Sequence, residues 1–137
     1  MKGPVRARVE VPRGSFVKRE LHGGGGVDFV SPLPCPFNYG YLPGYEGQDG
    51  DPADAVIMGR RLPLGEEIEL PVVARVRFVD AGQNDCKWVL SASPLRPRDR
   101  LALATFFRLY AHAKTVLNKL RGKHGRTAYL GLDKGGD

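Results

Sequence analysis

The sequence has little cysteine and histidine, and it has no long apolar run. Its two cysteines, Cys35 and Cys86, and its three histidines show no metal-ligand spacing, which argues against a zinc site and a disulfide scaffold. No window approaches about eighteen consecutive apolar residues, the length of a membrane-spanning helix. The first residues also lack the apolar segment of a signal peptide. We therefore expect a cytoplasmic protein.

Motifs of covalent and P-loop catalysis are missing as well. The chain contains no G-x-S-x-G nucleophile motif, no Walker A loop and no Cys/His pair. Its four-glycine run, residues 23–26, is not followed by a helical pattern, so we interpret it as a hairpin connection. These absences argue against hydrolases with a covalent intermediate and against P-loop enzymes.

Positive charge is the first feature that is present. The 137 residues include 21 Lys and Arg against 15 Asp and Glu, so the formal net charge is +6 and the pI is near 9.6. This balance favours anionic substrates or polyanionic partners. The length predicts one domain, residues 1–137.

The apolar pattern predicts a β-rich first part and a helix near the end. Short β-type runs broken by Gly and Pro cover residues 5–11, 16–21, 27–30, 55–58, 68–79 and 88–90, which indicates a barrel or a sandwich. From Arg98 to Leu120 the period changes to that of one helix face, with Leu103, Phe106, Tyr110, Ala113, Leu117 and Leu120. Residues 127–132 are predicted to return as a short strand. The fold class is mainly β with α (α+β).

Three carboxylates stand close together in the segment Asp49-Gly50-Asp51-Pro52-Ala53-Asp54. In an extended chain Asp49 and Asp51 point to the same side, and three like charges at this spacing repel each other. A divalent cation removes the repulsion, and Mg²⁺ prefers a few carboxylates together with substrate phosphate. The alternative is a solvated turn rich in Asp, Gly and Pro.

A second acidic pair, Asp80 and Asp85, flanks a predicted hairpin turn that would bring the two side chains near one another. Lys87 lies two residues after Asp85, on the same strand face. Glu10 ends the first predicted strand, and Lys18 and Glu20 share a face of the next. Strand ends and turns are where the openings of a barrel lie, so these groups could gather at one opening.

Five segments of the chain resemble, in order and spacing, the motifs of family I soluble inorganic pyrophosphatases: Val9–Pro12, Lys18–Glu20, Pro36–Gly40, Asp49–Asp54 and Asp80–Lys87. The resemblance runs from about Arg8 to Tyr110. It implies a five-stranded OB-type β-barrel with a long C-terminal flanking helix. It also implies Mg²⁺-dependent hydrolysis of pyrophosphate to two phosphates, with Mn²⁺ as a substitute, and a homo-oligomer.

The resemblance also assigns roles to individual residues. It implies that Asp51 accepts a proton from the attacking water, with Lys18 and Tyr39 also in the catalytic set. The implied metal shell is Asp49, Asp54, Asp80, Asp85 and Glu10. The implied substrate-binding groups are Lys18, Glu20, Tyr39, Lys87 and Tyr110. Tyr39 is expected in an Asn-Tyr-Gly turn near the aspartates, and Tyr110 is read either as a ligand group or as a half-buried core tyrosine.

The sequence departs from the family pattern at positions that would contact phosphate or the outer shell: Phe29 after Asp28, Cys35, Ala81 and Ala111. Lys114, one helical turn after Tyr110, could replace the lysine missing at Ala111, and Arg19, Arg60 or Arg61 could supply the missing guanidinium. Two alternatives stay open. One is a degenerate metal- and phosphate-binding module with weak or no turnover. The other is an OB-type nucleic-acid binder, which the unmetallated carboxylates disfavour.

Overall fold

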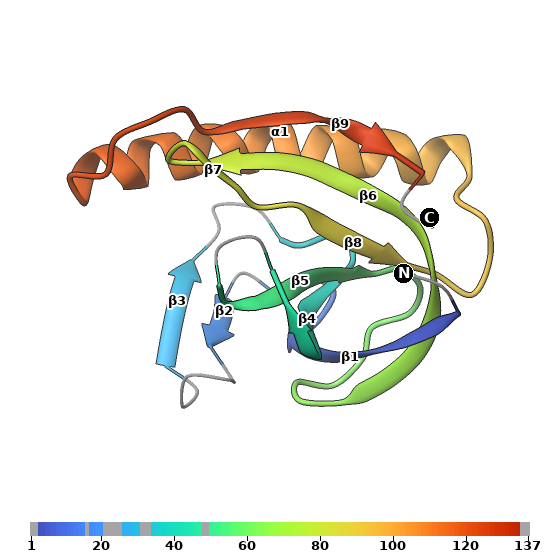
Figure 1. Cartoon of the computed structure of the whole chain (residues 1–137). Coiled ribbons are helices and arrows are strands. Elements are labelled where there is room, and N and C mark those ends of the chain that lie inside the picture. The colour runs from blue at the N-terminus through green and yellow to red at the C-terminus, as the bar shows by residue number, and fades with distance from the viewer. Residues whose placement is uncertain (1–2, 16, 21–25, 31–33, 48–49, 135–137) are drawn as a thin grey trace.

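Figure 1 shows the chain as a computed structural model, which describes all residues except 1–2, 16, 21–25, 31–33, 48–49 and 135–137. The described elements are the strands β1 (Pro4–Val11), β2 (Val17–Glu20), β3 (Gly26–Val30), β4 (Asn38–Glu46), β5 (Pro52–Ile57), β6 (Glu67–Asp80), β7 (Gln83–Asn84), β8 (Lys87–Leu90) and β9 (Ala128–Asp133), and the helix α1 (Pro97–Leu120). The predicted α+β class, with strands first and one long helix near the end, is confirmed.

Five strands close into a barrel in the order β1-β4-β5-β8-β6, and β6 pairs back to β1. All neighbours are antiparallel except β5 and β8, which run parallel with Asp54 opposite Lys87 and Ile57 opposite Leu90. Antiparallel pairing of Arg8 with Glu67 closes the barrel. The OB-type barrel implied by the family resemblance is thereby confirmed, and the parallel pair places two charged residues of distant sequence side by side.

The long strand β6 extends beyond the barrel. Its far end turns into β7 through Ala81 and Gly82, which both have positive φ, of 50° and 84°, as a tight hairpin requires. The strand β9 pairs with the same part of β6, and β2 and β3 form a separate antiparallel hairpin. Residues 21–25, most of the predicted glycine-rich connection, lie outside the described residues.

Two apolar clusters occupy the two faces of the barrel wall. One contains Val9, Leu42, Ala55 and Leu90 with further residues from barrel strands and Leu62 from the segment after β5, so it fills the barrel. The other joins Tyr39, Val76 and Phe78 of the wall to Leu103 and Phe107 of α1, so it holds the helix against the outside. Figure 1 shows α1 lying along this side of the barrel, together with β6 and β9. The outer face under α1 also carries the charged residues discussed below.

The buried face of α1 differs from the predicted one. Leu103, Phe107, Ala111 and Asn118 are buried, whereas Leu120 is 81% exposed. Apolar residues spaced by three and four positions fall on two neighbouring faces of this helix. Contact with the barrel buries the face next to the predicted one. The helix begins at Pro97, and the carboxylate of Asp99 accepts a hydrogen bond of 2.9 Å from the backbone N–H of Arg96.

The Asn-Tyr-Gly segment is not a turn, as predicted, but the start of β4. A side chain at Gly40 would place its Cβ 1.8 Å from the backbone oxygen of Arg8, so only glycine permits the close approach of β4 to β1. Asn38 and Tyr39 are buried beside it. No described helix combines the length and the apolar character needed to span a membrane.

Candidate functional site

Charged side chains converge where the parallel strands β5 and β8 begin. The Nζ atom of Lys87 lies 2.9 Å from Oδ2 of Asp54 and 2.8 Å from Oδ2 of Asp85. The Lys87 side chain is only 1% exposed, and the two carboxylates are about one-fifth exposed. One buried ammonium therefore holds two carboxylates together at the edge of solvent.

The charge on Lys87 is fixed by its surroundings. Burial alone would lower the pKa of the ammonium, but the carboxylates of Asp54 and Asp85 raise that pKa well above its ordinary value. Its Nζ also lies 5.8 Å from the ring centre of Tyr39 and 5.4 Å from that of Phe78. Lys87 therefore remains a cation throughout the neutral range.

Two tyrosines border the same place. Burial, and then the negative charge of Asp54, raise the pKa of Tyr39 well above its ordinary value, so its hydroxyl stays neutral. Tyr110 is half-buried in an aromatic cluster, with its ring 5.6 Å from Phe78, and it acts electrostatically on both Tyr39 and Lys87. Tyr110 thus combines a core ring with a hydroxyl close to the charged residues.

Asp80, at the end of β6, contacts the helix. Its Oδ1 accepts a hydrogen bond of 2.8 Å from Nδ2 of Asn118, and its Oδ2 lies 3.4 Å from Nζ of Lys114. Burial would raise the pKa of Asp80, but the hydrogen bond from Asn118 and the charge of Lys114 outweigh it and lower that pKa. The predicted hairpin between Asp80 and Asp85 is present, yet the two carboxylates pair with different lysines.

The remaining predicted residues come from several elements. Glu10 is buried in β1 at a bulge between the register pairs of Val9 and Val11, and Asp51 is exposed just before β5. Asp49 and the side chains of Lys18 and Glu20 lie outside the described part of the structure.

Two of the positions that depart from the family pattern are buried in the core. Ala111 is on the buried face of α1, and Cys35 is buried as well. Lys114 reaches Asp80 with a side chain that is 12% exposed. Arg60 and Arg61 follow the opposite end of β5 from Asp54, so they do not border the carboxylates.

Asn118 was not predicted. It is 4% exposed, and its Nδ2 also lies 3.0 Å from the hydroxyl of Thr127. The only signal in the sequence for this residue is its position seven residues after Ala111, which puts both on the buried face of the helix.

The donor set can be tested for a divalent cation. Within the described residues, no three His, Cys, Asp or Glu side chains are grouped as a metal site. Asp54 and Asp85 nevertheless approach one common cationic atom, and carboxylate oxygens are the ligands that Mg²⁺ prefers. These two residues fit a hard divalent cation in chemistry.

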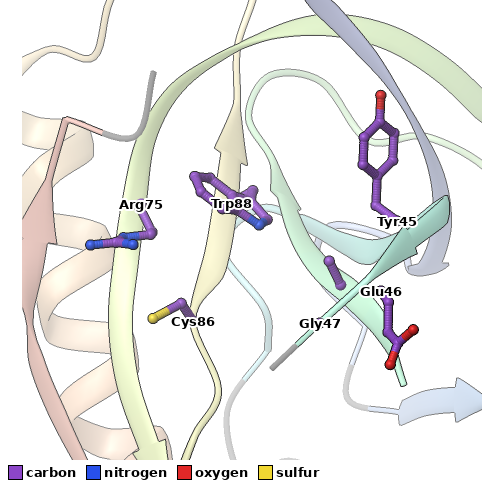
Figure 2. Close-up of a pocket in the computed structure, with 7 residues that line it drawn as sticks. Tyr45, Glu46, Gly47, Arg75, Cys86 and Trp88 are labelled. Atoms are coloured by element: carbon purple, nitrogen blue, oxygen red, sulfur yellow. The ribbon is translucent and has the colours of Figure 1, made fainter. Parts of the chain in front are cut away.

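A pocket of about 250 Å³ lies on the other face of β8 (Figure 2). Cys86 and Trp88 alternate with Lys87 along the strand, so they face away from it. The guanidinium of Arg75 lies 5.8 Å from the Trp88 ring and pairs with Asp133 at 2.8 Å. The pocket is therefore separated from the charged cluster by the barrel wall.

Comparison with known proteins gives concordant results. The sequence model of the inorganic pyrophosphatase family matches residues 7–127. The inorganic pyrophosphatase of Sulfolobus acidocaldarius is 36% identical over 91 residues, which are 62% of this chain and 53% of the relative. The soluble inorganic pyrophosphatase 2 of Chlamydomonas reinhardtii is 42% identical over 92 residues, 62% of this chain and 47% of the relative. The chain spans about half the length of the relatives it matches.

A solved structure gives the same fold. The inorganic pyrophosphatase of Helicobacter pylori is similar with a TM-score of 0.78 at 20% identity, over 96% of this chain and 85% of that one. At this identity the likeness concerns the fold alone.

Proposed function

Because the chain belongs to the inorganic pyrophosphatase family, we propose that it hydrolyses inorganic pyrophosphate to two phosphates with the help of a divalent cation. The observation that carries this proposal is the convergence of Asp54 and Asp85 on one buried cation, Lys87. A divalent metal is a general requirement of the family, and Mg²⁺, with Mn²⁺ as a substitute, is the cation we propose. Asp54 and Asp85 would hold it, with Asp49, Asp80 and Glu10 completing the shell.

The chain's own groups have distinct tasks in this proposal. Lys87 keeps two carboxylates adjacent and presents positive charge to the anionic substrate. Tyr39 and Tyr110, as neutral hydroxyls, would donate hydrogen bonds to phosphate oxygens. Asp51, at the exposed entrance, would accept a proton from the attacking water. A bound divalent cation would supply electrostatic stabilisation of the phosphoryl oxygens.

Substrate binding would also use residues near the hairpin. Lys18 and Glu20 of β2 belong to the proposed substrate-binding set, and Lys114 is proposed to replace the lysine missing at Ala111. The ammonium of Lys114 lies beside Asp80, and Asp80 also interacts electrostatically with Lys87. This places Lys114 near the charged residues and supports the replacement.

The test is release of phosphate from pyrophosphate by the purified protein in Mg²⁺ or Mn²⁺. We expect Asp51→Asn to reduce the rate by at least about 10²-fold, the usual scale of general-base loss. The charge-matched control is Glu69→Gln, an exposed carboxylate of β6. The absence of phosphate release from the unsubstituted protein at every pH would contradict the proposal, as would equal rates for the two variants.

We also propose that the chain forms a homo-oligomer through the outer face of α1. Leu101, Leu109, Val116 and Leu120 are between 46% and 81% exposed, and at 100° per residue they lie within one arc of about 100°. Leu101 and Val116 are placed symmetrically about the helix centre, so an antiparallel second copy would match them with each other.

Sedimentation velocity tests this assembly. Val116→Glu should shift the distribution to the monomer, whereas Leu64→Glu, at another exposed apolar site, should not. A protein that is monomeric at every concentration would contradict the proposal.

We further propose a cytoplasmic location, since Cys35 and Cys86 are both free thiols. Recovery of the protein from an oxidising compartment would contradict this proposal.

A further inference from the structure

A cavity of about 600 Å³ lies at the start of α1, where β5 and β8 end. Its charged lining consists of Arg13, Arg96, Arg98 and Asp99, and Pro36, Met58 and Pro94 supply much of its apolar surface. We call it the arginine cavity. Its volume is within the range of about 300–1,000 Å³ that is usual for small-molecule sites.

The arginine cavity is separate from the carboxylate site. Asp54 and Lys87 are paired near the beginning of the parallel strands, whereas Met58 and Ser91 directly follow their ends. The four residues from Asp54 to Met58 correspond to about 13 Å of strand. The same direction is visible in Figure 1, where β5 and β8 both point toward the end of the molecule at which α1 begins. A ligand in this cavity would therefore not occupy the proposed catalytic site.

The cavity has excess positive charge that the described protein does not neutralise. Arg13, Arg96 and Arg98 are exposed, and none of them forms an ion pair with a described residue. The carboxylate of Asp99 already accepts the backbone N–H of Arg96 as the helix cap. Three arginines thus line one space that holds a single carboxylate, which the helix cap already uses.

Arg13, which comes from the barrel side of the cavity, is held by two hydrogen bonds to backbone oxygens, one of them its own. Nη1 of Arg13 donates to the oxygen of Gly59 at 3.0 Å, and Nη1 of Arg61 donates to the oxygen of Arg13 at 2.7 Å. The first bond uses one donor of the Arg13 guanidinium and leaves its other donors for a ligand, and the second holds the backbone of Arg13 in place.

Asn38 makes this arrangement rigid. The residue is fully buried, and its Oδ1 accepts the N–H groups of Arg13 and Leu62 at 3.0 and 2.9 Å. Its Nδ2 donates to the oxygens of Ile57 and Arg60 at 3.3 and 2.8 Å. A single amide with all four bonds made therefore ties the loop of Arg13 to the loop after β5. Such a fixed frame lowers the entropic cost of binding.

We propose that the arginine cavity binds an organic polyphosphate of the size of a nucleoside di- or triphosphate. Guanidinium groups match phosphate oxygens with two parallel hydrogen bonds, which favours a multiply charged phosphate. The prolines and Met58 offer apolar contact to a ring, which a bare inorganic anion would not use. This inference goes beyond the proposed hydrolysis and does not depend on it.

The experiment is a titration of the full chain with a fluorescent N-methylanthraniloyl derivative of ATP, followed by anisotropy in EDTA. Chelation removes the cations on which the carboxylate site would depend. We expect saturable binding, weakened at least about tenfold by Arg13→Gln with Arg98→Gln, because each substitution removes charge-assisted hydrogen bonds to phosphate. The control with the same loss of charge is Arg77→Gln with Arg121→Gln, two exposed arginines elsewhere; it should change the affinity less than about twofold.

Further arms separate the outcomes. Arg96→Gln with Arg98→Gln leaves the bond from Arg13 to Gly59 intact and should give a similar loss. Asp51→Asn should bind the nucleotide as the unsubstituted protein does, even if it hydrolyses nothing. Absence of saturation, equal weakening by the control pair, or displacement by inorganic phosphate at the same concentration as by ATP would each overturn the proposal.

Discussion

The two ends of the strand pair β5 and β8 differ in how their charged side chains are paired. At the beginning, Lys87 is buried and its charge is balanced by Asp54 and Asp85. At the end, Arg96 and Arg98 are exposed, and their guanidinium groups form no ion pair with a described carboxylate. The first arrangement pairs its ammonium within the protein, whereas the second leaves positive charge open to solvent or to an external anion. The difference indicates that net charge says little about either site, because the decisive quantity is the local balance.

The largest expected contrast concerns the two thiols. Cys35 lies at the arginine end, bonded through its backbone to Gly14 and Ser15, and burial raises its pKa to about 12. With that pKa, only about one thiol in ten thousand is ionised at pH 8, and the thiolate is the reactive form. Cys86 lies at the other end and is half-exposed. Iodoacetamide at pH 8 should modify Cys86 alone, as read by peptide mass spectrometry.

Unfolding in urea provides the control for that experiment, since both cysteines should then react. Modification of Cys35 in the folded protein at a rate near that of Cys86 would show that its environment is more open than described.

Lys87→Met tests the balanced end. Removal of the ammonium leaves Asp54 and Asp85 as adjacent uncompensated charges, so the free energy of unfolding should fall by about 3–5 kcal/mol. Urea denaturation measures it. Lys119→Met, an exposed lysine of α1, should change stability by less than about 0.5 kcal/mol. A loss below about 1 kcal/mol for Lys87→Met would mean that the pair is not essential to the fold.

Asn38→Ala tests the frame at the arginine end. It leaves the N–H groups of Arg13 and Leu62 without their acceptor, and we expect a loss of about 2–4 kcal/mol from these unpaired groups. Thermal unfolding followed by circular dichroism measures the change. Asn84→Ala, in the exposed strand β7, serves as the matched variant and should unfold near the unsubstituted protein. Similar melting of both variants would argue against the frame.

The smallest effect is expected for Arg98→Gln. Because Arg98 has no described ion pair, its loss should alter the free energy of unfolding by no more than about 0.5 kcal/mol. Arg75→Gln, which removes the pair with Asp133, should cost slightly more, up to about 1 kcal/mol. Urea titration of both variants compares them. A large loss of unfolding free energy for Arg98→Gln would mean that Arg98 has a structural role that its described contacts do not show.

Much of the fold could be predicted from the sequence, because strand and helix periods are local signals. The helix from Pro97 and the β-rich first part follow from such periods. The strand β4 could not be found in this way, since Pro43 and Gly44 interrupt its pattern and look like turn residues. Its extended form is imposed by pairing with β1 and β5, and no local window contains those partners.

The site was predictable to a similar degree. Asp54, Asp85 and Lys87 were selected from spacing and resemblance, and the structure brings them within hydrogen-bond distance. The contact of Asp80 with Asn118 was not predicted, because it joins residues 38 positions apart in sequence through the packing of α1. Sequence patterns indicate which residues have the right chemistry, whereas tertiary packing decides which of them meet.

Closure of the barrel by β1 against β6 has a consequence for biosynthesis. Arg8 pairs with Glu67, so the first strand must wait for a partner that is translated 59 positions later. Until then, one edge of β1 and its apolar side chains remain open to other chains. We expect the nascent polypeptide to pass through an aggregation-sensitive interval on the ribosome that ends only when β6 emerges. Contacts so distant along the chain also favour slow folding.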